Sequence, residues 1–167
     1  MTPPADETID SGIFTGRLRR LDLDVARRVL VVDDDELELE LIADRLKAAG
    51  LEVVRAHDGS DALRLLEQTE CAVLVVDWQM PSMDGIELTE RLRAGGKEEI
   101  YIIMLTARGS GFDYDRGYLA GVDDYLTKKL PDTELLARIH TGFNMVALRR
   151  ELKRARARIA QLEAGQR

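Results

Sequence analysis

Residues 71–77 read CAVLVVD, a run of six apolar residues that ends in an aspartate. Residues 29–35, which read VLVVDDD, repeat the same form. Neither run alternates polar with apolar side chains, as a strand with one solvent-exposed face would. Strands of this kind are typically buried on both faces, in a parallel sheet covered by helices. The two runs therefore predict central strands that each carry carboxylates at the carboxyl end.

The rest of the chain continues this alternation of short apolar runs and helical patterns. The predicted strands cover Val29–Val32, Leu51–Ala56, Cys71–Val76, Ile100–Leu105 and Asp124–Leu126. The predicted helices cover Glu36–Ala49, Ser60–Gln68, Ile86–Arg93, Asp113–Ala120 and a long segment from Thr133 onward. Five such units predict an α/β fold with a five-stranded, parallel, doubly wound sheet. Its active crevice is expected at the carboxyl ends of the strands.

Composition limits the classes of function. The 167 residues suffice for one domain with short extensions, and the single cysteine, Cys71, excludes an internal disulfide. No apolar run approaches the roughly 20 residues that span a bilayer, so we expect a cytoplasmic protein without membrane contact. The net charge is −7, but the segment from Leu148 onward holds seven Lys or Arg and two Glu. Nucleic-acid binding by the acidic remainder is not expected, because phosphate contacts need clustered cations.

Polar residues follow the predicted strands at the expected crevice. They are Asp33, Asp34, Asp35, His57, Asp58, Asp77, Thr106 and Lys128. Any one aspartate after a strand is more commonly a helix N-cap than a catalyst. The joint arrangement of acids, a hydroxyl and a lysine nevertheless indicates one shared site.

Such a site favours phosphoryl transfer. Converging carboxylates repel one another unless a cation lies among them, and hard oxygen ligands select Mg²⁺ or Ca²⁺. A lysine and a threonine opposite the metal would hold a tetrahedral oxyanion, and a carboxylate can itself become an aspartyl phosphate. The chain has no glycine-rich phosphate loop and no kinase signature, so a bound nucleotide is not the expected donor.

Four ordered motifs resemble the receiver domain of two-component response regulators, over residues 28–142. They are Val31–Asp35, Val75–Pro81 followed by Asp84-Gly85, Met104–Arg108 and Gly121–Lys128. The resemblance implies that Asp77 accepts a phosphoryl group from a histidine kinase or phosphotransfer protein. It also implies no enzymatic activity beyond self-phosphorylation and slow autodephosphorylation.

The resemblance further assigns the remaining site residues. Asp34 would bind Mg²⁺ directly and Asp33 through water, with Asp77 and the backbone carbonyl of Gln79 as further ligands. Thr106 and Lys128 would bind phosphoryl oxygens. Thr106 and Tyr125 would form the conformational switch. The helix before Tyr125 would be loosened by glycines, which are Gly109, Gly111 and Gly117.

Lys129 departs from the family pattern, which has proline after the lysine, joined by a cis peptide. A cis bond before a non-proline residue costs about 2.5 to 4 kcal/mol. The Lys128–Lys129 bond is therefore either cis and strained, or trans with a different aim of Lys128, in which case Lys129 is an alternative contact.

The end of the last helix carries an apolar seam with alternating spacings of three and four. Its residues are Met145, Leu148, Leu152, Ala155, Ile159 and Leu162. With Leu152 as heptad position a, a parallel pair would set Glu151 opposite Arg156 and Arg158 opposite Glu163, all of opposite sign. We expect a parallel homodimer. The alternatives are a helix folded back on its own domain and a basic tail that contacts an acidic partner such as nucleic acid.

The domain division that follows is an N-terminal extension over 1–27, a receiver over 28–142 and a helical extension over 143–167. We predict that the N-terminal extension includes a short amphipathic helix between Ile13 and Val25. The chain would act alone or as the front of a longer signalling protein. Two rival functions are a constitutively dimeric receiver that is never phosphorylated and an aspartate-nucleophile phosphohydrolase using Asp33 and Asp35, for which Leu37 is the wrong following residue.

Overall fold

The computed structural model describes residues 25–107 and 114–164, and these contain a five-stranded sheet with strand order β2-β1-β3-β4-β5. All four strand pairings are parallel. The strands are β1 (Arg28–Val32), β2 (Glu52–Ala56), β3 (Val73–Asp77), β4 (Tyr101–Thr106) and β5 (Asp124–Thr127). The helices are α2 (Glu36–Ala48), α3 (Gly59–Gln68), α4 (Gly85–Ala94), α5 (Tyr114–Ala120) and α6 (Asp132–Ala164). The predicted fold class is confirmed.

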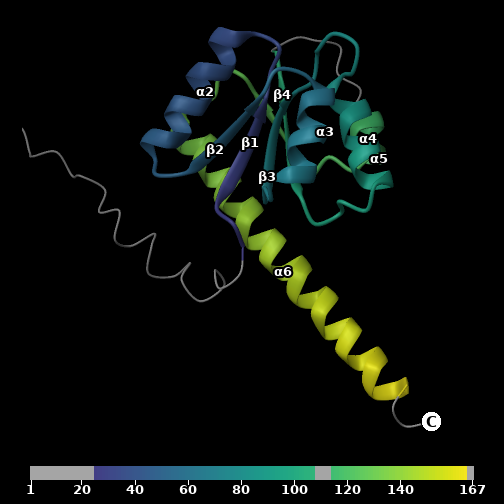
Figure 1. Cartoon of the computed structure of the whole chain (residues 1–167). Helices are drawn as coiled ribbons and strands as arrows, with labels where there is room; N and C mark the ends of the chain where they lie inside the picture. Colours follow the sequence, from purple (N-terminus) through teal and green to yellow (C-terminus); the bar gives the residue numbers. More distant parts are fainter. Residues whose placement is uncertain (1–24, 108–113, 165–167) are drawn as a thin grey trace, which may run out of the picture.

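Helices cover both faces of the sheet (Figure 1). The helices α3, α4 and α5 pack on one face, and α2 and the first half of α6 pack on the other. Successive strand residues point to opposite faces, so Leu30 and Val32 join the first core while Val29 and Val31 join the second. This double coverage explains why the central strands are apolar at every position.

Burial distinguishes the central strands from the edge strands. Every residue of β3 and β4 is buried, as are the last four residues of β1. In β2, by contrast, Glu52 and Arg55 are exposed, and in β5 only Leu126 is fully buried. The strands β2 and β5 are less buried because each lies at an edge of the sheet.

Asp35 and Asp58, which follow strands, and Asp84, which precedes α4, are helix N-caps. The carboxylate of Asp35 accepts hydrogen bonds from the backbone N–H groups of α2, at 2.9 and 3.2 Å. Asp58 caps α3 at 2.8 Å and Asp84 caps α4 at 2.7 Å. These bonds satisfy amides that the first turn of a helix leaves unpaired. His57, next to Asp58, pairs with Glu36 at the surface.

The last helix, α6, has 33 residues and is therefore about 50 Å long. It continues unbroken through residue 142, and every residue from 151 to 164 is exposed. Figure 1 shows this part, in yellow, running out from the sheet. The alternative in which the helix folds back on its own domain is therefore wrong. None of the helices between residues 25 and 164 that the structure describes is long and apolar enough to cross a membrane.

Some predictions fall on residues outside the described ranges. The helix predicted between Ile13 and Val25 lies there except for its last residue, and so do Arg108, Gly109 and Gly111. They stay predictions.

Candidate functional site

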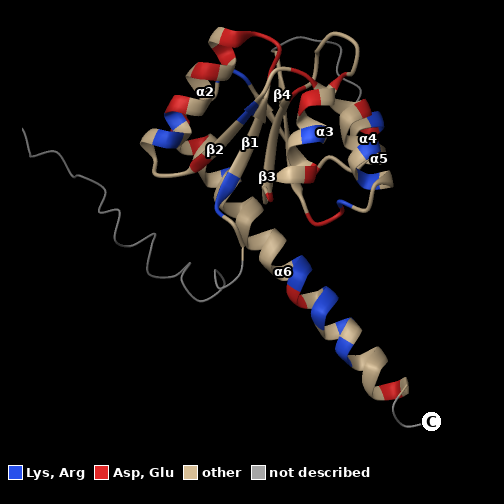
Figure 2. Ribbon diagram, in the orientation of Figure 1, with Lys and Arg blue, Asp and Glu red and all other residues tan. Residues whose placement is uncertain are grey.

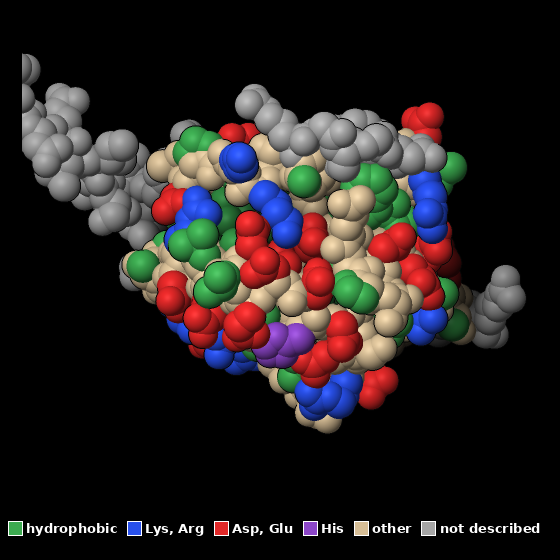
Figure 3. Space-filling model, turned by 90° about the horizontal axis from the view of Figure 1, so that it is seen from above, with side chains coloured by type: hydrophobic (Ala, Val, Ile, Leu, Met, Phe, Trp, Pro, Cys, Tyr) green, Lys and Arg blue, Asp and Glu red, His purple; other side chains and the backbone are tan. Residues whose placement is uncertain are grey.

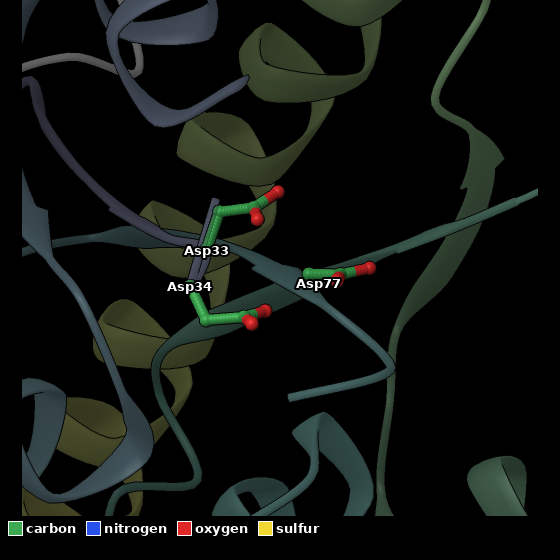
Figure 4. Close-up of side chains that lie close together, drawn as sticks. All are labelled: Asp33, Asp34 and Asp77. Atoms are coloured by element: carbon green, nitrogen blue, oxygen red, sulfur yellow. The ribbon is translucent and has the colours of Figure 1, made fainter. Parts of the chain in front are cut away.

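Three carboxylates meet at the carboxyl edge of the sheet. Asp33 and Asp34 follow β1, and Asp77 ends the neighbouring strand β3. One carboxylate oxygen from each lies within 4.8 Å of the others. Figure 4 shows the three side chains extending in the same direction. Asp33 and Asp77 are buried and Asp34 is exposed, so the group opens to solvent on one side.

Acidic side chains also dominate the surrounding surface. Figure 3, which looks down on the edge where the strands end, shows Asp and Glu side chains gathered over the middle of this face. A cavity of about 310 Å³ lies beside the site and is lined in part by Asp34, Asp58 and Met83. The site therefore faces a hollow that solvent and a reactant can enter.

Lys128 joins two of the carboxylates from the opposite edge of the sheet. Its Nζ lies 2.8 Å from Oδ2 of Asp33 and 3.2 Å from Oδ2 of Asp77. Its backbone N–H donates to the carbonyl of Thr106 at 3.0 Å, which fixes where the side chain starts. Glu38 of α2 lies 3.5 Å from the same ammonium, a contact that the sequence did not indicate.

The Lys128–Lys129 peptide is trans, because the described residues contain no cis peptide bond. Lys128 still reaches Asp33 and Asp77 from this geometry, while Lys129 is exposed. Of the two arrangements left open by the sequence, the structure has the trans one, and it is Lys128 that lies among the carboxylates.

Burial and charge set the protonation of the site. The pKa of Asp77 is raised to about 6, chiefly by burial and also by the charge of Asp33, against the lowering effects of Lys128 and of a hydrogen bond from the backbone of Gln79. Burial alone would lower the pKa of Lys128, but its hydrogen bond to Asp33 and the charge of Asp77 raise it above the ordinary value. Lys128 is therefore charged and Asp77 is mostly ionised at neutral pH.

The donor set suits Mg²⁺. The group offers three carboxylates against one ammonium, so it retains a net negative charge. Mg²⁺ typically binds through one or two carboxylates, keeps several waters and uses substrate phosphate oxygens. Asp34, exposed beside the buried pair, leaves room for those waters. Gln79 is exposed, and its backbone contacts Asp77, which places its peptide beside the group.

The loop after β3 depends on Gly85, a residue of the Asp84-Gly85 motif whose role the sequence does not reveal. A Cβ on Gly85 would lie 2.5 Å from the carbonyl oxygen of Asp77 and 3.2 Å from the Cε of Met104. The Gly85 N–H also donates to the carbonyl of Trp78 at 2.9 Å. Gly85 thus lets α4 begin directly beneath the carboxylate group.

Thr106 and Tyr125 lie on neighbouring strands. Thr106 is the last residue of β4 and is 6% exposed. Tyr125 of β5 is half-buried against the core of α3, α4 and α5, and its ring meets the ring of Tyr118 edge-on, with centroids 5.1 Å apart. Asp35, by contrast, points its carboxylate to the amides of α2, which weighs against the phosphohydrolase pairing of Asp33 with Asp35.

Comparisons with known proteins agree with this geometry. Residues 29–140 match the model of the family described as response regulator receiver domain. The uncharacterized transcriptional regulatory protein YrkP of Bacillus subtilis (strain 168) is 39% identical over 129 residues, which are 77% of this chain and 54% of YrkP. The chain thus spans about half the length of that relative.

Solved structures give the same result. The receiver domain of the Francisella response regulator 1452 is 35% identical, with a TM-score of 0.64 over 70% of this chain and 96% of that one. The chemotaxis protein CheY4 of Vibrio cholerae is 29% identical, with a TM-score of 0.65 over 71% and 98% of the two chains.

Proposed function

Because this chain belongs to the response regulator receiver family, whose general role is to accept a phosphoryl group in signalling, we propose that Asp77 is its phospho-acceptor. The donor in this proposal is a histidine kinase or a phosphotransfer protein. The observation that carries the proposal is the position of the Asp77 carboxylate, which lies 3.2 Å from the Lys128 ammonium and within 4.8 Å of carboxylate oxygens of Asp33 and Asp34.

In the reaction, an ionised oxygen of Asp77 forms a bond to phosphorus as the bond from phosphorus to the donor's imidazole nitrogen breaks. The imidazole keeps the electron pair and takes up a proton. Asp34, Asp77, the Gln79 carbonyl and, through water, Asp33 would hold Mg²⁺, which would supply charge neutralisation for the transferring group. Lys128 and the hydroxyl of Thr106 bind phosphoryl oxygens. Catalysis is then mainly positioning and charge compensation, as is general for phosphoryl transfer.

The switch in this proposal uses Thr106 and Tyr125. Adding a phosphoryl group places new negative charge beside Lys128 and Thr106, at the ends of β4 and β5. A local change of charge can bias an element that has two packing arrangements. That element is Tyr125 of β5, whose ring packs against Tyr118 of α5. The face formed by α5, β5 and α6 then transmits the signal to a partner.

The exposed half of α6 is the proposed dimer interface, and its occupant is a second copy of this chain in parallel orientation. Its seam residues are exposed, among them Leu148 at 48%, Leu152 at 52% and Ile159 at 55%. Figure 2 shows acidic and basic residues interspersed along this part of the helix. The complementary signs of Glu151 with Arg156, and of Arg158 with Glu163, favour a parallel copy over an unrelated acidic partner.

Sedimentation velocity tests the proposal with beryllium fluoride, which with Mg²⁺ mimics an aspartyl phosphate. The wild type should change in mass or shape when both are added, and Asp77→Ala should not. Phosphorylation by an acyl phosphate should likewise label the wild type but not Asp77→Ala. A dimer that is identical in every sample, with no label on Asp77, would instead favour the constitutively dimeric receiver.

A further inference from the structure

Asp123, the residue before β5, is held by arginines from two different helices. Its Oδ2 lies 2.9 Å from Nη2 of Arg93 in α4 and accepts a 2.8 Å hydrogen bond from the Ile102 N–H. Its Oδ1 pairs with Nη2 of Arg149 in α6. We call Arg93, Asp123 and Arg149 the Asp123 cluster. The Asp123 side chain is only 12% exposed, so these contacts are shielded from solvent.

Arg149 is anchored by more than this ion pair. Its Nη1 donates to the carbonyls of Glu98 and Ile100 at 3.3 and 3.4 Å. Its guanidinium carbon lies 5.9 Å from the centre of the Tyr101 ring. Lys153, one turn further along α6, instead pairs with Glu99 and is 70% exposed. Exposed pairs contribute little, so Arg149 is the stronger attachment of α6 to the start of β4 and β5.

The cluster lies at one end of a strand whose other end is the phosphorylation site. β5 spans Asp124–Thr127, with Asp123 directly before it and Lys128 directly after it. Tyr125 lies between the two. A strand of four residues therefore connects the ammonium beside Asp77 to the carboxylate that holds α6.

Arg149 also borders the proposed dimer seam. It stands seven residues before Arg156, so it occupies the same heptad position, directly beside Met145 and Leu152. The position that a parallel pair sets opposite Arg149 belongs to Asn144, which carries no charge. Dimerisation thus leaves the Asp123–Arg149 pair intact while placing it at the first turn of the interface.

We propose that the Asp123–Arg149 ion pair couples the phosphorylation site to the dimer of α6. The inference rests on the proposed function and deepens it by naming the link. A shift of β5 that follows binding at Lys128 moves Asp123, and Arg149 transfers this movement to the orientation of α6 where the seam begins. Coupling between two sites is reciprocal, so dimerisation should also change the affinity of the site for the phosphoryl mimic.

The test measures the dimer dissociation constant by sedimentation equilibrium, with and without Mg²⁺ and beryllium fluoride. It compares the full-length wild type, Arg149→Ala and the control Lys153→Ala, which removes a cation of α6 outside the cluster. Fluorescence of Trp78, the single tryptophan and the neighbour of Asp77, reports occupancy of the site in every sample. Asp77→Ala is the negative control for that signal.

We expect the mimic to change the dissociation constant of the wild type and of Lys153→Ala by about 5- to 150-fold, the range typical of coupled sites. In Arg149→Ala the change should fall below twofold while Trp78 still responds, and Arg149→Lys should restore part of it. An equal change in Arg149→Ala, or none in a wild type whose Trp78 responds, would overturn the inference alone. A wild type whose Trp78 signal matches that of Asp77→Ala would overturn the proposed function as well.

Discussion

The hydroxyl of Tyr125 occupies the space in which a side chain on Gly117 would stand. A Cβ at Gly117 would collide with that oxygen and lie 3.0 Å from Cζ of the same ring. From the sequence, Gly117 was expected only to loosen its helix. The structure instead shows that the glycine allows β5 and α5 to approach through the tyrosine.

Gly117→Ala should therefore have opposite effects in two backgrounds. In the wild type the added methyl group overpacks against Tyr125 and should lower the free energy of unfolding by about 1 to 3 kcal/mol. In the Tyr125→Ala background the tyrosine hydroxyl is absent. The better helix propensity of alanine should then raise the free energy of unfolding by up to about 1 kcal/mol. Urea denaturation of the four proteins measures both, and a loss of equal size in both backgrounds would contradict the packing argument.

Asp77→Asn should be more stable than the wild type at neutral pH in the absence of metal. The pKa of Asp77 is raised from 3.8 to about 6 in the folded state, chiefly by burial. A folded state that binds the proton more tightly loses stability as the pH rises from about 4 to 6, and the loss persists above 6. A shift of this size corresponds to about 3 kcal/mol.

Denaturation in EDTA between pH 4 and 8 measures this difference. The free energy of unfolding of Asp77→Asn relative to the wild type should grow from about pH 4 to about pH 6 and stay level from there to pH 8. Parallel pH profiles for the two proteins would show that Asp77 titrates normally.

Lys128→Ala should destabilise the protein, and Mg²⁺ should compensate. Removing the ammonium leaves the buried carboxylates of Asp33 and Asp77 facing each other, a loss of about 3 kcal/mol. Because the variant site is more negative, saturating Mg²⁺ should raise its free energy of unfolding more than that of the wild type. Exposed Lys129→Ala is the control and should stay within about 0.5 kcal/mol of the wild type. Equal losses in the two variants, read from chemical denaturation, would show that the bridging contact contributes nothing.

Leu152→Asp should abolish the proposed dimer without destabilising the receiver. Leu152 is 52% exposed, so a charge there costs little in a monomer. In a parallel pair the same change puts two carboxylates into an apolar seam. Ala157→Asp, on the same exposed stretch but away from the seam, is the matched control. Sedimentation should give a monomer for the first and the wild-type mass for the second, and the same mass for both would exclude this seam as the interface.

The sequence was enough to predict the fold and the gathering of the site residues. Apolar runs that end in Asp33 and Asp77 fixed the direction and neighbourhood of two strands, and a parallel sheet must bring such ends together. The sequence did not reveal which strands lie at the edges of the sheet. The edge strands β2 and β5 keep some buried apolar residues, so their sequences do not differ clearly from those of interior strands. The sequence analysis gave N-capping as the commoner role of an aspartate after a strand. It did not identify Asp35 and Asp58 as the residues that have this role.

Contacts between distant segments were beyond the sequence. Lys128 was assigned to the site by family resemblance. Its contacts with both Asp33 and Asp77 depend on the position of β5 relative to β1 and β3, which the sequence does not show. The spacing of Asp123 and Arg149 has no periodic pattern that would pair them. Gly117 and Gly85 carry no chemistry of their own, so only the atoms that approach them disclose their roles.

The strand order also sets the sequence of events as the chain leaves the ribosome. The first strand, β1, is an interior strand, and β2 and β3 pair directly with its two edges. The chain leaves the ribosome from its amino-terminal end, so β1, β2 and β3 are available before β4 and β5. The carboxylates of Asp33, Asp34 and Asp77 can thus meet before β4 and β5 are made, and Thr106 and Lys128 arrive last. At that stage the three carboxylates have no lysine to balance their charge. Mg²⁺ in the medium should therefore stabilise the partly synthesised sheet until Lys128 is made.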